Sequence, residues 1–364
     1  MEEALPLITD QYYTQPKWHF NVKAAHAFAC RFYLFTRDYD KCIEQANQVL
    51  GTDPTLLPSQ LINYAKFADD QNLTNYTNHW TGSDVANNIM LIDTYSSFFK
   101  HIASSSRYSH NAEAAHCTVN RAWPTAGYTI LPCALVSGLF INGNQDYGLW
   151  WSRNCGPSFQ YTDRVSGIGY YHNIRQEFTN TEVLLNRAEA EVLCSRHDTA
   201  AALADMQAIE NSRQTTPEYN DAFSPLTEQL VRRYWQYPGD LSAAYNRQQA
   251  GQSLYPSWSF TQRMSPSFVV PENCEKWMNL IQDYRRTELL FTGMRFFDLK
   301  RFGIEYSHIY GPNDEEFKLT WNDPRRAIEV PADALAAGLA SSRPKATDTN
   351  PTRVSSSSVR KINK

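Results

Sequence analysis

The feature that most constrains the fold of this chain is a helical pattern near its start. Residues 22–54 contain two stretches of helical periodicity on either side of the turn sequence RDYD, and the pattern ends at Pro54. Cys30 and Cys42 occupy one small-residue position in each stretch, and Tyr33 occupies the position of a large ring. Small residues are needed where two antiparallel helices cross closely. We therefore predict a helical hairpin in which Cys30 and Cys42 face each other.

This pattern is typical of the second half of a tetratricopeptide repeat. A second hairpin is predicted at residues 178–213, where apolar residues recur at helical spacing on both sides of the turn sequence SRHD. Alanines are frequent in this region, which again favours close packing of the two helices. We therefore predict a mainly α-helical protein, with a scaffold of paired antiparallel helices at about residues 1–54 and 178–213.

The segments between and after the hairpins have a different composition. Residues 55–177 and 214–272 are rich in Gly, Asn, Ser, Pro and aromatic residues, which is typical of loops. Long loops inside a compact domain usually carry function, so we expect the binding region there. The polar, Ser-rich tail at residues 336–364 is expected to be extended or disordered.

A basic and aromatic stretch, RRTELLFTGMRFFDLKRFG, spans residues 285–303 and could bind nucleic acid, lie on a membrane or form a structural helix. The net charge of the chain is −4, whereas phosphate binding usually requires a basic surplus. The apolar residues of the stretch surround most of a helical cylinder, and Gly293 permits a bend. Lys300 and Arg301 lie near the end, where cations favour a helix C-terminus. We therefore predict a buried helix, in which the buried side chains include Phe296, Phe297 and Leu299.

Several classes of protein find no support in the sequence. No apolar run approaches the length of a transmembrane helix, and the acidic start, MEEALPLITDQ, does not resemble a signal peptide. The seven cysteines form no CxxC pair, and neither cysteines nor histidines show the spacing of a metal site or a catalytic triad. We therefore expect no metal, no cofactor and no catalytic residues.

Three blocks of the sequence resemble one family in the order in which they occur. DYRRTELLFTGMRFFDLKRFG resembles the C-terminal signature of the SusD/RagB family of nutrient-binding outer-membrane lipoproteins. IRQEFTNTEVLLNRAEAEVL resembles an internal helix of that family, and WNDPRRAIEVPADAL resembles its closing segment. Thr292 and Phe296 depart from the signature, where the family has an acid and a Trp. The signal peptide, lipid-modified cysteine and first repeat of the family have no counterpart, so we expect that an N-terminal part is absent from this chain.

The resemblance implies a SusD-like domain over residues 1–335, in which tetratricopeptide-like helices form an α/α superhelix with long irregular insertions. Its C-terminal helix region is expected at residues 273–335. The resemblance also implies a binding protein and not an enzyme. Such a protein binds a glycan or another nutrient at the cell surface and delivers it to a SusC-like TonB-dependent transporter. It sits on the outer side of the outer membrane, held by a lipid anchor that we do not expect in this chain.

Candidate ligand-binding residues were chosen for the chemistry of sugars, whose apolar faces pack on aromatic rings and whose hydroxyls bond polar side chains. The run DYGLWWSRN combines both kinds of residue, and we expect Trp150 or Trp151 to stack on a sugar within an aromatic platform at residues 140–171. Neighbouring residues of a strand point opposite ways, so one of the two is expected to face the ligand. For each tryptophan the alternative is core packing. The other candidates are Asp146, Tyr147, Arg153, Asn154, Asn78, Trp80 and Trp123.

Two other functions stay open at this point. A repeat-based adaptor for peptides or proteins would carry Lys and Arg along its inner repeat face, and residues 24–50 show no such pattern. A glycoside hydrolase needs two carboxyl groups about 5–10 Å apart across a cleft. Asp146, Asp163 and Glu177 lie in the loop-rich region, but the sequence does not give their separation. Binding without turnover would distinguish a nutrient receptor from both.

Overall fold

The chain forms two compact units in the computed structural model. The first unit comprises Met1–Tyr237 and Val270–Arg295, and the second comprises Pro238–Val269 and Phe296–Lys364. The structure describes residues 1–63, 73–96, 157–212, 228, 268, 270–289, 291–304, 306–310, 315–320, 323–341 and 352–353.

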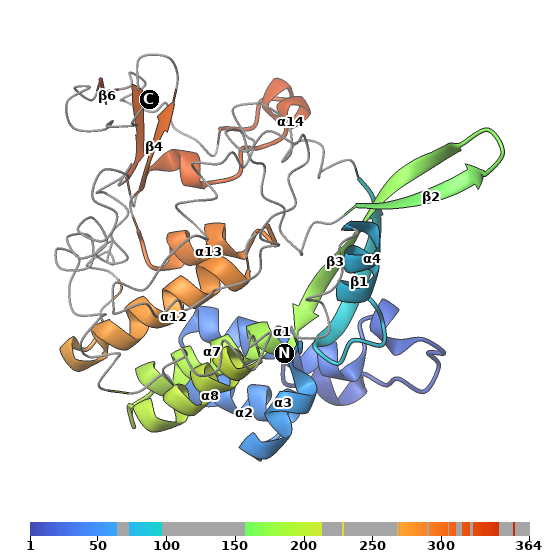
Figure 1. Cartoon of the computed structure of the whole chain (residues 1–364). Helices are drawn as coiled ribbons and strands as arrows, with labels where there is room; N and C mark the ends of the chain where they lie inside the picture. Colours follow the sequence, from blue (N-terminus) through green and yellow to red (C-terminus); the bar gives the residue numbers. More distant parts are fainter. Residues whose placement is uncertain are drawn as a thin grey trace, which may run out of the picture. The chain divides into compact units, whose positions relative to one another are not determined.

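Two antiparallel helical hairpins form the core of the first unit (Figure 1). The first consists of α1 (Val22–Thr36) and α2 (Tyr39–Leu50), and the second of α7 (Asn180–Leu193) and α8 (Thr199–Asn211). α7 lies at the centre, because it contacts α1, α2, α8 and also α12 (Glu275–Glu288). The two predicted hairpins are thus confirmed. The polar residues of α7 need partners inside the protein, since the helix is buried along almost its whole length.

The ends of these helices follow from local sequence. Asn21, Asp38, Thr179 and Asp198 each precede a helix, and each side chain accepts a hydrogen bond from the backbone N–H three residues later, at 2.8 to 3.4 Å. Such caps satisfy donors that have no partner within the helix. α1 is followed by Arg37, whose backbone is left-handed with φ of 65°, and α2 begins two residues after Arg37.

Cys30 and Cys42 face each other between α1 and α2, as predicted. Their Sγ atoms lie 3.6 Å apart, and both residues are fully buried free thiols. Burial raises the pKa of the Cys42 thiol, and the contact with Cys30 raises it further. The Cys42 thiol also lies 3.7 Å from the backbone carbonyl oxygen of Asn186 in α7. Larger side chains at these positions would therefore push apart three helices.

A three-stranded antiparallel sheet lies where the composition predicted only loops. It consists of β1 (Asn88–Tyr95), β2 (Pro157–Asp163) and β3 (Ile168–Thr179) in the order β1-β3-β2, and β3 continues directly into α7. Figure 1 shows β2 and β3 as a long two-stranded ribbon. Asp163 orders the turn between them, because its carboxylate accepts hydrogen bonds from the backbone N–H groups of Val165 and Ser166. Gly167 completes the turn with a positive φ of 69°.

The other elements that the structure describes in the first unit are short. They are the 3-10 helices η1 (Leu5–Leu7), η2 (Pro16–Trp18), η3 (Pro54–Leu56) and η7 (Glu272–Cys274), and the α-helices α3 (Leu57–Gln60) and α4 (Leu73–Trp80). The second unit has a sheet of order β4-β5-β6. Its described elements include β4 (Tyr306–Tyr310), β5 (Glu315–Leu319), β6 (Thr352–Arg353), η8 (Pro324–Arg326) and α14 (Ala332–Ala336).

The basic and aromatic stretch is structural, but it is two helices and not one. α12 ends at Glu288, Phe291 and Gly293 both have positive φ, and α13 (Met294–Arg301) begins directly afterwards. The bend predicted at Gly293 is therefore a complete break. Arg285 of this stretch is fully buried, and its guanidinium donates a hydrogen bond to the side-chain oxygen of Asn186 in α7.

The prediction that Phe296 and Phe297 are buried is wrong. Their exposed fractions are 37 % and 49 %. Burial on α13 follows a single narrow stripe at a spacing of four residues, through Met294, Asp298 and, just beyond the helix, Phe302. The short α13 buries only this one stripe. The rings of Phe296 and Phe297 lie off the stripe and therefore remain at the surface.

Arg326 ties together several segments of the second unit. Its side chain is buried and donates hydrogen bonds to the backbone oxygens of Thr320 at 2.7 Å, Leu319 at 3.2 Å, Leu299 at 2.9 Å and Ile304. It thereby satisfies carbonyl groups at the C-terminal end of α13, which lack partners within the helix. Arg326, the second arginine of the sequence DPRR, thus links α13 to β5 through hydrogen bonds.

Candidate binding site

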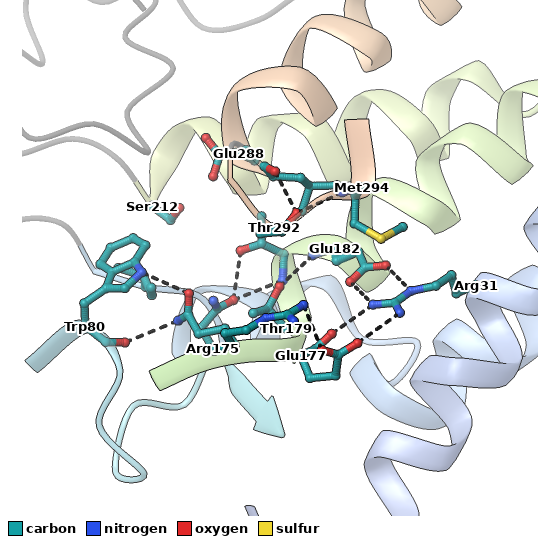
Figure 2. A pocket seen from close by; sticks show the side chains of 15 residues that line it. Arg31, Trp80, Arg175, Glu177, Thr179, Glu182, Ser212, Glu288, Thr292 and Met294 are labelled. Carbon is teal, nitrogen blue, oxygen red and sulfur yellow. Dashed lines mark hydrogen bonds and ion pairs between the residues drawn. The ribbon is translucent and has the colours of Figure 1, made fainter. Parts of the chain in front are cut away.

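A pocket opens in the first unit at the junction of β3 with α7 (Figure 2). Its walls also include residues of α1, the end of α4 and the segment that follows α12. The pocket has about 600 Å³ of empty space, part of it open to solvent.

Arg31 forms one wall of the pocket. Its guanidinium donates to both carboxylate oxygens of Glu182, at 2.7 and 2.8 Å, and to the backbone oxygen of Glu177 at 2.9 Å. The guanidinium carbon also lies 4.3 Å from the ring centre of Phe178. Burial opposes the charge of Arg31, but Glu182 and Glu177 outweigh it, so that the pKa of Arg31 is raised. Arg31 therefore joins α1 to the β3–α7 junction, and its role in the pocket is structural.

Asparagine and threonine side chains fix the junction itself. The side-chain oxygen of Asn87 accepts hydrogen bonds from the backbone N–H of Thr181 at 3.0 Å and from its hydroxyl at 2.8 Å. The amide of Asn180 donates to the backbone oxygens of Gln60 and Ala86, at 2.9 and 3.0 Å. Each of these bonds joins residues about 100 positions apart in the chain. The shape of the pocket is thus held by bonds between distant segments.

Trp80 lines the pocket although it is only 4 % exposed. Its indole Nε1 donates to the side-chain oxygen of Gln176 at 3.0 Å, and the Gln176 amide donates back to the Trp80 backbone oxygen at 3.3 Å. Asn88 donates to the same backbone oxygen at 3.1 Å. These bonds anchor α4 on the sheet. Asn78, the other candidate on α4, is exposed.

Arg175 and Glu177 are the charged groups at the mouth of the pocket. The Arg175 side chain is half exposed, and its guanidinium lies 3.3 Å from a carboxylate oxygen of Glu177. A guanidinium has five N–H donors, so a single carboxylate contact leaves donors for a ligand. The sequence reading missed Arg175 and Gln176. The aromatic and β-branched residues of YYHNIRQEF were the signal that could have identified a strand here.

Most of the candidate residues lie outside the described residues. The two carboxylates of the hydrolase alternative that the structure describes both have local partners. Asp163 accepts bonds from its own turn, and Glu177 contacts Arg31 and Arg175. The candidates outside the described residues are Asp146, Tyr147, Trp150, Trp151, Arg153, Asn154 and Trp123.

A membrane-spanning helix and a metal-binding cluster are both absent from the part of the chain that the structure describes. No described helix combines the length and the apolar character that crossing a bilayer requires. Nor do any three described His, Cys, Asp or Glu side chains come together as a metal site would need.

The fold and the pocket define a helical-repeat protein with a small sheet and a polar pocket where the sheet meets the repeats. The model of the SusD family matches residues 139–332, which is more than half of the sequence. The chain therefore belongs to the SusD family, and the resemblance stated above is confirmed. Proteins of this family are binding proteins and not enzymes.

Solved structures show the same fold. A SusD superfamily protein from Bacteroides vulgatus has a TM-score of 0.54 and 16 % sequence identity, over 94 % of this chain and 64 % of its own. A second, from Bacteroides thetaiotaomicron, has a TM-score of 0.52 and 16 % identity, over 92 % of this chain and 62 % of its own. This chain thus spans slightly less than two thirds of the length of either structure. The mainly helical fold class is confirmed. No curated protein matches the sequence.

Proposed function

We propose that this chain binds a glycan, or another nutrient, at the cell surface and delivers it to a SusC-like TonB-dependent transporter. The observation that carries the proposal is the match to the SusD family, whose members are surface lipoproteins of the outer membrane. On this proposal the protein works on the outer side of that membrane, next to the transporter. Its helical hairpins serve as the scaffold.

The pocket supports this proposal through the kinds of group that it offers. Arg175 and Glu177 are a donor and an acceptor suited to sugar hydroxyls, and the half-exposed Arg175 is the more accessible of the two. Residues 140–171 remain the proposed aromatic platform, with Trp150 or Trp151 stacking on a sugar ring. On this view the pocket holds hydroxyl groups while aromatic rings hold the apolar faces.

The proposal is tested by calorimetry of the chain against a panel of oligosaccharides, with the release of new reducing ends measured in the same samples. We expect binding without release. Release of reducing ends would indicate a glycoside hydrolase. Failure to bind any member of the panel, or of a matching peptide panel, would overturn the nutrient-binding proposal.

A matched pair of arginine variants tests the pocket. Arg175→Ala removes the accessible cation at its mouth, and we expect a loss of affinity of about tenfold or less, as for one exposed polar contact. Arg196→Ala is the control, because Arg196 is also an exposed arginine that contacts one carboxylate, Asp40 at 3.2 Å, but does not line the pocket. Equal affinity of the two variants would remove the pocket from the proposed site.

A further inference from the structure

The outer half of the β1-β3-β2 sheet exposes large aromatic rings. Tyr95 is 74 % exposed, Tyr170 57 % and Tyr161 55 %. In the strand register Tyr95 is opposite His172, two residues from Tyr170, so Tyr95 and Tyr170 share one face of the sheet. Tyr161 is opposite Gly169 and therefore lies on the other face. The two faces have different neighbours and call for separate explanations.

The face that carries Tyr161 has a structural explanation. Gly169 leaves a gap on this face, and the ring of Phe159 fills it: a Cβ atom at Gly169 would lie 2.7 Å from that ring. The rings of Tyr161 and Tyr171 each pack edge-on against Phe159, with centres 4.8 Å apart. Aromatic residues that cover a glycine in a neighbouring strand stabilise a hairpin. No ligand is needed to account for these three rings.

The opposite face combines exposed rings with polar groups. The rings of Tyr95 and Tyr170 are perpendicular, with centres 6.0 Å apart. Asp93 lies two residues from Tyr95 on the same face, is nearly half exposed, and has one carboxylate oxygen 2.9 Å from Nδ1 of His172. Gln160, which is exposed, lies opposite Tyr170 in the register. Ring faces, a carboxylate and an amide are thus placed side by side.

His172 adds a second indication that this face binds something. Its side chain is buried beneath the ring of Tyr95, whose centre lies 4.3 Å from that of the imidazole. Because Nδ1 faces a carboxylate acceptor, Nδ1 carries a hydrogen, and Nε2 is the ring nitrogen left to bond another group. Among the described residues, this buried Nε2 has no hydrogen-bond partner. A buried polar nitrogen without a partner is unfavourable, and a ligand hydroxyl, which can donate or accept, would satisfy it if the Tyr95 ring rotated to admit the ligand.

We propose that this face, defined by Asp93, Tyr95, Gln160, Tyr170 and His172, binds a neutral sugar chain. The proposal rests on the proposed function and names a second contact surface for the same ligand class, apart from the pocket. The apolar faces of sugar rings would pack on the two tyrosines, while Asp93, Gln160 and His172 bond the hydroxyls. Because Asp93 is negatively charged, the surface disfavours chains of uronic acids or sulfated sugars.

The test is affinity electrophoresis of the whole chain in gels that contain amylopectin, xylan, galactomannan or polygalacturonate. We expect retardation by at least one neutral polysaccharide and none by polygalacturonate. Tyr95→Ala and Tyr170→Ala should each weaken that retardation about tenfold, as expected for loss of one stacked ring. Tyr95→Phe and Tyr170→Phe, which keep the rings, should bind nearly as the parent does.

Tyr161→Ala is the matched control, because it removes an equally exposed ring from the other face of the same hairpin. Equal losses in Tyr161→Ala and Tyr170→Ala would overturn the assignment to one face. Parental binding by both alanine variants of the proposed face would overturn the inference while leaving the proposed function intact. Absence of retardation for the parent in all neutral gels would overturn the inference, and the proposed function falls with it only if the calorimetric panels of oligosaccharides and peptides also show no binding. If these alanine variants do not fold, Asp93→Ala decides, because it removes the carboxylate that bonds the hydroxyls, and an unchanged affinity in that variant contradicts the proposal.

Discussion

Glu191 in α7 is expected to make the stability of the first unit depend on pH. Its side chain is buried, and its carboxylate lies 3.9 Å from Nε of Arg187. Arg187, however, makes two close hydrogen bonds at 2.7 Å with Asp205, so its charge is mainly neutralised there. The second carboxylate oxygen of Glu191 is buried and has no hydrogen-bond partner among the described residues. Burial, and next the charge of Asp205, therefore raise the pKa of Glu191 from 4.5 to about 8.

The sign of the pH effect follows from that raised pKa. Below pH 4.5 Glu191 is protonated in both the folded and the unfolded chain, and its contribution to stability is fully present. Between pH 4.5 and about 8 the unfolded chain releases the proton while the folded chain keeps it, so the free energy of unfolding falls as the pH rises. Each unit of pKa difference corresponds to about 1.4 kcal/mol, so the loss amounts to several kcal/mol at most.

Glu191→Gln keeps the shape of the side chain and cannot ionise. Between pH 5 and pH 9, we expect the free energy of unfolding of the parent to fall by at least about 2 kcal/mol more than that of the variant. At pH 9 the variant should therefore be the more stable of the two. The measurement is urea unfolding at pH 5, 7 and 9. Glu44→Gln, an exposed position on α2, is the control and should follow the parent. Parallel stability curves for the parent and Glu191→Gln would refute the reasoning.

Three further predictions concern the scaffold. Arg326→Ala should lower the free energy of unfolding of the second unit by about 3 kcal/mol or more, because four backbone oxygens lose a charged donor. An unchanged thermal unfolding temperature would show that Arg326 does not hold these segments together. Phe297→Ala should lower stability by less than about 1 kcal/mol, whereas Phe302→Ala, at a fully buried ring, should lower it by about 3–5 kcal/mol in the same urea assay. Cys30 and Cys42 should react with a bulky thiol reagent only after unfolding, and rapid labelling of the native chain would show that α1 and α2 do not cross there.

The two hairpins could be predicted because the information for them is local. Helical periodicity, the caps at Asn21, Asp38 and Asp198 and the turn sequences all act within a few residues of one another. The register of Cys30 against Cys42 follows from the same spacing once the hairpin is assumed. The family blocks could be recognised for the same reason, since each is a continuous stretch of sequence.

One residue chosen from the sequence lies at the pocket. Trp80 was chosen as a candidate, and it does line the pocket, but its indole is engaged with Gln176 and nearly buried. Arg175 was missed, because composition alone marked its surroundings as a loop. The aromatic and β-branched residues of β3 were visible in the sequence, but its partner strand β1 lies about 80 residues earlier in the chain.

The tertiary structure alone decided which polar groups are paired and which rings are buried. Arg285 meets Asn186, and Arg31 meets Glu182, only because α7 passes between segments that are more than 90 residues away in sequence. Phe297 and Phe302 are chemically identical, yet one is half exposed and the other buried, because α13 turns a single stripe inward. Periodicity identifies a helix and its possible faces, but which face is buried depends on where the neighbouring elements lie, and that is a property of the whole packed chain.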